Sequence, residues 1–420
     1  MMELPAGGDL QPRMTDHGIG VLQSSSTPLV RIDVVDEAGS AYQAMPLCAS
    51  AALRLHTCAS ATMSQAEVSE WIDYRGVVLE HTPDVLAATT TVYTLSKYAQ
   101  EVCSLLAGLR REPLFPQREF DVYRAQRRQE VAEAMMRPRD VARRLWYSRL
   151  FGREHPLGRY ATTADAERLS LDEVRRHYAQ RFNAPRVLLS GAVDAGLERA
   201  AEELLGSGVQ PRAVDRVGSL APMPGIDGGS EPLYEHIDGT TQASLRAGRV
   251  LPVDWRDPDY AGLMLLTTLL GGYFGSRLMG NLREDKGYTY GVYARTQLYR
   301  GCVVFYIAAD VAAHAAGPAE AEVRRELRRL AAEEVDGAEL DLVKTVMAGD
   351  FMRSVDGVFE RAERVCGMVQ AGVDETLTDN LRGVLASATP SYLRSLAAKW
   401  LREDDMVYCR AGNLDNGPQA

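Results

Sequence analysis

A repeat at a spacing of about 220 residues constrains the fold of this 420-residue chain more than any other feature of its sequence. The matched pairs, in chain order, are Glu119-Phe120 with Glu339-Leu340, LSLDEVRRHYAQRF from Leu169 with SATPSYLRSLAAKWL from Ser387, and RVLLSGAVD from Arg186 with DMVYCRAGNLD from Asp405. Two unrelated halves of mixed helix and strand would also look alike at this coarse level. Three ordered matches at one spacing nevertheless favour a duplicated domain, because self-similarity at a fixed spacing marks a repeated structural unit.

Hydrophobic periodicity predicts the same order of elements in each half: a strand, helices, strands, a helix, a long helix, a helix and a final strand. In the first half we expect strands at 29–34, 77–82, 86–95 and 186–193, and helices at 46–56, 64–76, 98–109, 117–136 and 171–182, with Pro138 stopping the long helix. In the second half we expect strands at 242–248, 288–296 and 303–309, and helices at 258–272, 320–334, 338–353 and 390–401. Because strands are grouped rather than alternating with helices, the pattern predicts an α+β fold of two homologous domains, each a mainly antiparallel sheet flanked by helices.

The composition changes between the two halves. Gly, Pro, Ser and Asp dominate from Gly206 to Pro232, which is typical of an interdomain linker. The first 27 residues are polar and rich in Gly and Ser, which indicates a flexible tail. We therefore expect a tail at 1–27, an N-terminal domain at 28–212, a linker at 213–232 and a C-terminal domain at 233–420.

Charge and composition exclude several classes of function. The formal net charge is −10, whereas a nucleic-acid-binding protein normally carries a basic excess, so we expect no nucleic-acid partner. No window reaches 18 consecutive apolar residues and the N-terminus lacks the pattern of a secretory signal, so we expect neither a membrane span nor export. The six cysteines form no C-x-x-C pair, which is typical of free thiols in a reducing compartment, and the predicted location is the cytoplasm.

The histidines offer no recognisable metal site. Seven are present, and no two lie within five residues of each other, so no helix can present two imidazoles to one ion. A site assembled from distant histidines is the remaining alternative. We expect no metal ligand in this chain.

The segment richest in chemical groups runs from Leu269 to Tyr299. There Gly271 and Gly272 end one helix, and Ser276 is expected to cap the next. Arg283 and Tyr290 lie seven residues apart on either side of a turn, so the two side chains can converge. A guanidinium and a phenol are a suitable pair of donors for a developing oxyanion. The same pattern also fits a structural corner with a surface arginine and core-packing tyrosines.

The stretch from Gly271 to Gly291 resembles the second-domain signature of the pitrilysin/insulinase metallopeptidases, the family that includes the mitochondrial processing peptidase. Further segments are similar to that family and follow its order: AGSAYQ from Ala38, SQAEVSEWIDYRGVVLE from Ser64, EPLFPQREFDVYRAQRRQE from Glu112 and HPLGR from His155. The resemblance covers nearly the whole chain after the tail. It also implies two homologous α+β domains, as the repeat does.

Family members hold zinc with an inverted H-x-x-E-H helix and a glutamate from the long helix. Here the motif position reads Ser50-Ala51-Ala52-Leu53-Arg54, and Glu130 matches the third ligand. The resemblance therefore implies a peptidase-like N-terminal domain without the zinc motif, and a chain that has no cofactor and is inactive alone. Arg283 and Tyr290 match the family pair that binds the substrate carbonyl and stabilises the tetrahedral intermediate, and Gly271 and Gly272 belong to the same substrate-binding signature.

The resemblance implies that this chain is the non-catalytic, substrate-binding subunit of a heterodimeric zinc metallopeptidase that cleaves peptides. A homologous chain with the zinc motif would supply the zinc, and the peptide would lie as an added strand on a sheet edge, such as 77–82 or the partner's edge. Two alternatives remain. One is a structural or scaffold member without peptidase activity, like the family's core subunits of a respiratory complex, which could form a homodimer. The other is a standalone peptidase with a non-standard metal site.

Overall fold

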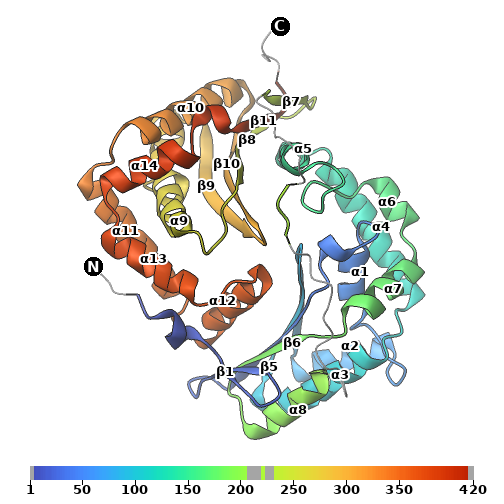
Figure 1. Ribbon diagram of the computed structural model, residues 1–420. Coiled ribbons are helices and arrows are strands. Elements are labelled where there is room, and N and C mark those ends of the chain that lie inside the picture. The colour runs from blue at the N-terminus through green and yellow to red at the C-terminus, as the bar shows by residue number, and fades with distance from the viewer. Residues whose placement is uncertain (1–3, 206–218, 223–230, 415–420) are drawn as a thin grey trace.

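The computed structural model describes residues 4–205, 219–222 and 231–414, which form two halves of mixed helix and strand (Figure 1). Each half contains one sheet, with the strand order β1-β2-β6-β3-β5-β4 in the first and β7-β11-β8-β10-β9 in the second. The predicted α+β class is confirmed. Most of the expected linker at 213–232 lies outside the described residues.

The two sheets are built in the same way. The first contains β1 (Arg13–Met14), β2 (Gly20–Gln23), β3 (Leu29–Asp36), β4 (Val78–Pro83), β5 (Ala88–Leu95) and β6 (Arg186–Gly191). The second contains β7 (Leu233–His236), β8 (Gln242–Leu251), β9 (Thr289–Tyr299), β10 (Cys302–Ala312) and β11 (Val407–Gly412). The pairs β2/β6 and β7/β11 are parallel, and the other pairs of named strands are antiparallel. The order of pairing is therefore the same in both halves.

The helices repeat as well. Those of the first half are α1 (Cys48–Leu55), α2 (Gln65–Arg75), α3 (Ala99–Arg111), α4 (Gln117–Ala134), α5 (Pro138–Phe151), α6 (Thr163–Arg168), α7 (Leu171–Arg181) and α8 (Ala195–Leu205). Those of the second are α9 (Pro258–Gly271), α10 (Ala316–Ala332), α11 (Gly337–Arg353), α12 (Val358–Ala371), α13 (Thr376–Ser387) and α14 (Pro390–Trp400). The segments that match in sequence occupy equivalent elements, namely α4 with α11, α7 with α14 and β6 with β11.

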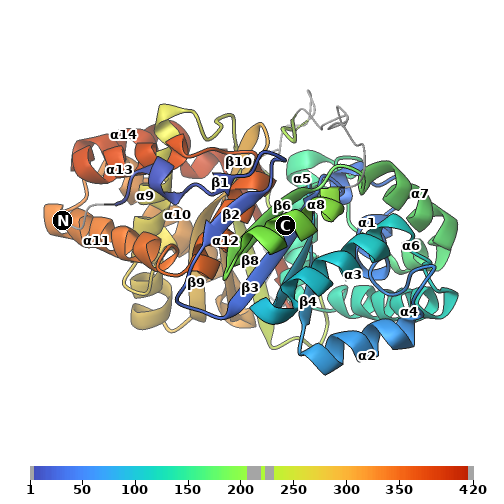
Figure 2. The same ribbon diagram turned by 90° about the horizontal axis from the view of Figure 1, so that it is seen from below.

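Each half contributes one helix to the other half's sheet. Helix α5 packs against β8 and β11 of the second sheet, and α12 packs against β2, β3 and β6 of the first (Figures 1 and 2). On α5, the side chain of Trp146 is fully buried and its indole N–H donates to the backbone oxygen of Val407, 2.9 Å away. Two helices that occupy equivalent places in the repeat are therefore exchanged across the interface.

The remaining helices of each half cover the opposite face of its own sheet. Along β8, Ala243, Leu245 and Ala247 are buried in a core with residues from α9, α10, α11, α13 and α14. Because side chains alternate across a strand, Ser244 and Arg246 face the other side, toward α5. This alternation determines which polar groups of β8 lie between the two halves.

One expectation about the first half is wrong. The segment expected as a flexible tail at 1–27 contains β2, which pairs with β6 and buries Val21 and Leu22, because a parallel partner far along the chain completes this edge of the sheet. Pro138 does follow the end of α4, but it also begins α5 at the first helical position, where its missing N–H is not needed. No helix among the described residues is long and apolar enough to cross a membrane.

Candidate functional site

The corner that carries the predicted Arg/Tyr pair begins where α9 ends. Asp257 caps α9 by accepting from the backbone N–H of Asp259, and the helix ends at Gly271 as predicted. A Cβ on Gly271 would lie 2.6 Å from the backbone nitrogen of Ala294, and one on Gly272 would lie 2.5 Å from the Cα of Thr268. Gly271 therefore allows the end of α9 to pack closely against β9, whereas the close contact at Gly272 is with the last turn of α9 itself.

A π-helical turn, η4 (Met279–Asp285), follows and carries Arg283. Its widened geometry is seen in the bond from the backbone N–H of Lys286 to the oxygen of Asn281, five residues earlier. Such turns occur frequently at functional sites. The expected cap is absent here, since the buried Ser276 hydroxyl has no hydrogen-bond partner among the described residues.

Tyr290 lies on β9 with 89% of its surface exposed. It lines a cavity of about 640 Å³ together with Gly271, Gly272 and Phe274. The guanidinium of Arg283 lies over the ring of Phe274, 4.8 Å from its centroid, and its Nε is 3.4 Å from the Oε1 of Glu284. The structure thus brings Tyr290 and both glycines to one cavity and places Arg283 beside it on Phe274. The alternative of core-packing tyrosines fits Tyr288, which packs on the core, but not Tyr290.

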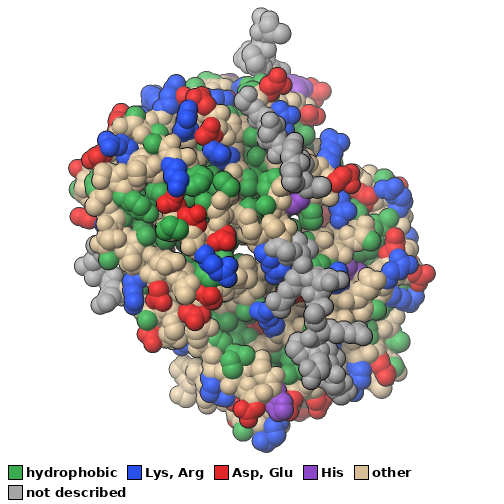
Figure 3. Space-filling model, in the orientation of Figure 1, with side chains coloured by type: hydrophobic (Ala, Val, Ile, Leu, Met, Phe, Trp, Pro, Cys, Tyr) green, Lys and Arg blue, Asp and Glu red, His purple; other side chains and the backbone are tan. Residues whose placement is uncertain are grey.

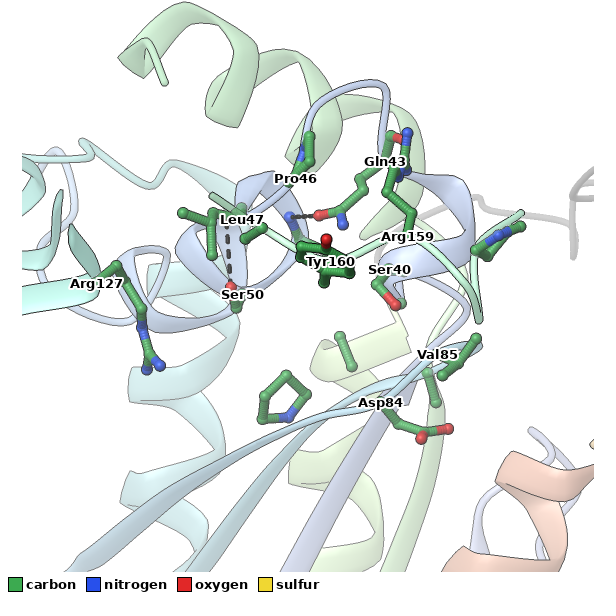
Figure 4. Close-up of a pocket in the computed structure, with 18 residues that line it drawn as sticks. Ser40, Gln43, Pro46, Leu47, Ser50, Asp84, Val85, Arg127, Arg159 and Tyr160 are labelled. Carbon is green, nitrogen blue, oxygen red and sulfur yellow. Dashed lines mark hydrogen bonds between the residues drawn. The ribbon is translucent and has the colours of Figure 1, made fainter. Parts of the chain in front are cut away.

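A second cavity, of about 360 Å³, lies at the start of α1, where the resemblance expects zinc (Figure 4). Ser50 lines it, and its hydroxyl is 2.6 Å from the hydroxyl of Tyr123 and 3.2 Å from the backbone oxygen of Leu47. Burial raises the pKa of Tyr123, so this phenol stays protonated and acts as a hydrogen-bond donor or acceptor. Ser50, at the first ligand position of the zinc motif, is therefore part of an uncharged network of hydrogen bonds.

The other zinc positions do not fit a metal ion either. Leu53 is buried in the core beneath α1, and Arg54 is exposed. Glu130 is paired with Arg127, whose Nη1 is 2.6 Å from the Oε2 of the carboxylate. The described residues contain no group of three or more His, Cys, Asp or Glu side chains placed to hold a metal ion. Ser50 and Arg54 offer no zinc donor, and the single carboxylate of Glu130 is too few, since zinc sites in proteins take at least three imidazole, thiolate or carboxylate ligands.

Two histidines near the end of α1 have structural surroundings. His56 is fully buried, with Nδ1 2.9 Å from the backbone oxygen of Leu53 and its ring stacked on Tyr178. Burial lowers the pKa of His56 well below its usual range, and burial lowers that of His81 to about 4. Both rings are therefore neutral near pH 7, and Nε2 of His81 lies 2.9 Å from the hydroxyl of Thr57.

Comparison with known proteins agrees with this geometry. Residues 168–347 match the family described as the peptidase M16 inactive domain. The chain is 25% identical over 289 residues to an uncharacterized zinc protease of Rickettsia bellii, a match that covers 66% of each chain. It is 22% identical over 315 residues to an uncharacterized zinc protease of Streptomyces coelicolor, a match that covers 70% of this chain and 64% of that protein. The chain thus spans just under two thirds of the length of these relatives.

Three solved structures share the fold over almost the whole chain. A peptidase M16 inactive domain from Pseudomonas fluorescens has a TM-score of 0.80 at 22% identity and covers 96% of this chain and 98% of its own. A protease from Helicobacter pylori has a TM-score of 0.78 at 17% identity, with 96% and 100% covered. A chain of complex III2 from Candida albicans has a TM-score of 0.72 at 13% identity, with 97% of both covered. At these identities the likeness is one of fold.

The described residues thus form two α+β halves of one plan, with no metal-binding cluster among them and with an exposed tyrosine at a glycine-rich corner of the second half. Residues 168–347 match the peptidase M16 inactive domain, and the chain shares its two-domain fold with a solved structure of that description.

Proposed function

We propose that this chain is the substrate-binding subunit of a heterodimeric zinc metallopeptidase that cleaves peptides, and that its partner is a homologous chain bearing the zinc motif. The observation that carries the proposal is the contrast between the two cavities. The first contains Ser50 and Arg127 where a metal would need ligands, whereas the second presents an exposed Tyr290 beside Arg283. A purely structural chain has no need of an exposed phenol at that corner.

In this proposal the partner supplies the zinc, and this chain supplies two donors. The Tyr290 O–H and the Arg283 guanidinium donate to the carbonyl oxygen of the scissile bond as it gains negative charge. Donors positioned in advance are worth more there than in water, because in this proposal the two chains enclose the peptide and exclude solvent. Gly271 and Gly272 leave the floor of the cavity free of side chains, so that an extended peptide can approach the backbone.

The peptide is proposed to lie as an added strand. In the first sheet β4 is an edge strand, and its residues are largely exposed. In the second sheet β9, which carries Tyr290, is the edge strand. An exposed edge offers unpaired backbone groups to an extended peptide. The proposal includes a cytoplasmic location, no nucleic-acid partner, and assembly with a homologous chain rather than with a second copy of this chain.

A structural or scaffold role is the second candidate, and the fold shared with a chain of complex III2 supports it. The two candidates differ in one observable property. A substrate-binding subunit confers cleavage on a zinc-bearing partner, whereas a scaffold does not.

The test is reconstitution. The chain is purified alone, mixed with a homologous chain bearing H-x-x-E-H from the same genome, and assayed for cleavage of an unstructured peptide library, with zinc measured by elemental analysis. We expect cleavage only by the mixture, with zinc in the partner and none bound stoichiometrically by this chain after mild chelation. Cleavage by the partner alone at the same rate, or tightly held zinc in this chain, would refute the proposal.

A further inference from the structure

A third cavity, of about 670 Å³, lies between α5 and the inner face of the second sheet. Its lining is positively charged because it contains five arginines: Arg139, Arg143, Arg144, Arg159 and Arg246. It shares Arg139, Arg246 and Tyr293 with the cavity that contains Tyr290, so the two are continuous. Figure 3 shows the molecule hollowed between its two halves, with blue side chains at the border of the hollow.

The local charge of this cavity is opposite to that of the chain. The formal net charge of the whole sequence is −10, yet among the described residues that line the cavity Asp140 is the only carboxylate. Asp140 is 3.8 Å from Arg143, and Arg139 is paired with Asp310 of the neighbouring cavity. The charge of Asp140 also acts on Arg144, while Arg159 donates to the backbone oxygen of Gln43. A low-dielectric cavity lined by one sign of charge concentrates ligands of the opposite sign.

The decisive residue is Arg246 on β8, which is only 5% exposed. Its Nε has no hydrogen-bond partner, and no carboxylate lies within ion-pair distance of its guanidinium among the residues that the structure describes. The guanidinium lies 5.9 Å from the ring centroid of Tyr306. An arginine cannot lose its proton in a protein, so the cation is buried without a counter-charge, an arrangement that is normally strongly unfavourable.

The repeat shows what a neutralised version of this position looks like. Asp33 pairs with Leu188, the third residue of β6, and Arg246 pairs with Cys409, the third residue of the matching strand β11. Asp33 and Arg246 therefore occupy equivalent positions in the two halves. Asp33 is 2.8 Å from Arg31 on the same strand face, and Arg31 is also 2.8 Å from Glu363 of α12. In the second half the position equivalent to Arg31 is Ser244, whose buried hydroxyl also lacks a partner in the described part of the chain. Among the described residues, the first half therefore neutralises its buried charge internally, and the second half does not.

We propose that this cavity binds a carboxylate of the peptide substrate, so that the chain selects acidic peptides. The proposal rests on the function proposed above, because it assumes that a peptide occupies the hollow next to Tyr290. A guanidinium presents two parallel N–H donors that match a carboxylate, and Arg246 lies where such a group completes the missing pair. The carboxylate belongs either to an aspartate or glutamate side chain or to the peptide C-terminus.

Binding to the isolated full-length chain tests this without cleavage and without a partner. The probes are dye-labelled peptides of Gly, Ser and Glu with an amidated C-terminus, the same peptides with Gln in place of Glu, and the Gln peptides with a free C-terminus, measured by fluorescence anisotropy. We expect the Glu peptide or the free-carboxylate peptide to bind at least about tenfold more tightly than the amidated Gln peptide, which corresponds to one charge-assisted hydrogen bond. Tighter binding of the Glu peptide identifies a side-chain carboxylate as the ligand, and tighter binding of the Gln peptide with a free C-terminus identifies the C-terminal carboxylate.

Variants locate the site. Arg246→Met is expected to weaken binding of the acidic peptide by about tenfold or more, and Arg246→Lys less. Arg143→Gln, at an exposed position that does not endanger folding, is expected to weaken it by up to about fivefold. Arg402→Gln, an exposed arginine outside the cavity, is the matched control and should change nothing.

Equal binding of all three peptides, or an unchanged affinity in folded Arg246→Met and Arg143→Gln proteins, would overturn the inference. If Arg246→Met fails to fold, Arg143→Gln and Arg246→Lys decide. Failure of the reconstituted pair to cleave peptides would leave these binding results standing, so the two proposals fail separately.

Discussion

Substitution of Trp146 by alanine tests whether the exchange of helices joins the two halves into one cooperative unit. Trp146 is fully buried on α5, and its only described hydrogen bond crosses to the backbone of Val407 in the other half. Truncating a buried tryptophan to alanine costs about 3–5 kcal/mol through lost burial and the cavity left behind. Losing the donor to the Val407 oxygen adds about 1 kcal/mol. We therefore expect a loss of about 4–6 kcal/mol in the free energy of unfolding.

The size of the cooperative unit determines how this loss is seen by calorimetry. Unfolding entropy is about 2.1 cal/mol/K per residue, so a single unit of 420 residues has about 0.9 kcal/mol/K and its Tm falls by about 5 °C. A half that unfolds independently has about half that entropy, so its own Tm falls by about 10 °C while the other transition stays in place. We expect one transition in the wild type and one, shifted by about 5 °C, in Trp146→Ala.

Two further variants control this experiment. Trp146→Phe keeps most of the ring but removes the N–H donor, so its shift should lie between those of the wild type and Trp146→Ala. Tyr74→Ala, at a position that is 82% exposed, should change the free energy by no more than about 0.5 kcal/mol. Two separate transitions, or a shift for Trp146→Ala no larger than that for Tyr74→Ala, would refute the reasoning.

Three other changes have expected outcomes. Arg31→Met leaves Asp33 buried without its cation and should lower the free energy of unfolding, measured in urea, by about 3–5 kcal/mol. Arg75→Met, whose partner Glu101 is half exposed, should lower it by less than about 1 kcal/mol, and similar values for both variants would contradict this reasoning. Burial lowers the pKa of His81 to about 4, so its ring stays neutral in the folded state, whereas in the unfolded state it takes up a proton below about pH 6.5. Stability should therefore fall as the pH drops from about 6.5 to 4, by up to about 3 kcal/mol from this group. His81→Gln should make the urea midpoint less pH-dependent over that range, and an unchanged slope would argue against it. Gly271→Ala would bring a Cβ to 2.6 Å from the backbone nitrogen of Ala294 and should lower the free energy of unfolding by about 1–3 kcal/mol. Gly280→Ala, where a Cβ meets nothing within 4 Å, should leave stability unchanged or raise it. Equal effects of the two changes would contradict close packing at Gly271.

Local chemistry explains which helix ends could be predicted from the sequence. Ser64 and Glu67 form the reciprocal capping box that their spacing predicts, and Gly76 ends α2 in the left-handed conformation. Asp257 and Pro258 likewise begin α9 at the predicted residue. In each of these cases the signal lies within a few residues of the feature that it determines.

Features that depend on distant contacts could not be predicted in this way. Pro138 is compatible both with the end of one helix and with the first turn of another, and α5 buries its apolar face against a sheet formed more than a hundred residues later. Strand β2 is four residues long, and its partner β6 begins at Arg186. Arg246 was not identified as a candidate because nothing local to β8 indicates that α5 encloses the opposite face of that strand.

The candidate site was predictable in part for the same reason. The glycines, Arg283 and Tyr290 lie within twenty residues of one another, and the sequence alone identified the corner. The structure adds that Tyr290 is exposed and that Phe274 lies between the cavity and Arg283, a ring that the sequence did not single out. The arginines of the adjoining cavity come from α5, β8 and the segment before α6, and only the fold brings them together.

The most direct test of the account is the kcat for peptide cleavage by the reconstituted pair when this chain carries Tyr290→Phe. The account predicts a loss of about 10²–10³-fold, the usual effect of removing one oxyanion donor, and a similar loss for Arg283→Ala. Tyr74→Phe removes a comparably exposed phenol far from the corner and should leave kcat unchanged. Assembly and the zinc content of the partner should be the same in every variant. Full activity in an assembled Arg283→Ala/Tyr290→Phe complex would contradict the account and leave both residues with a structural role.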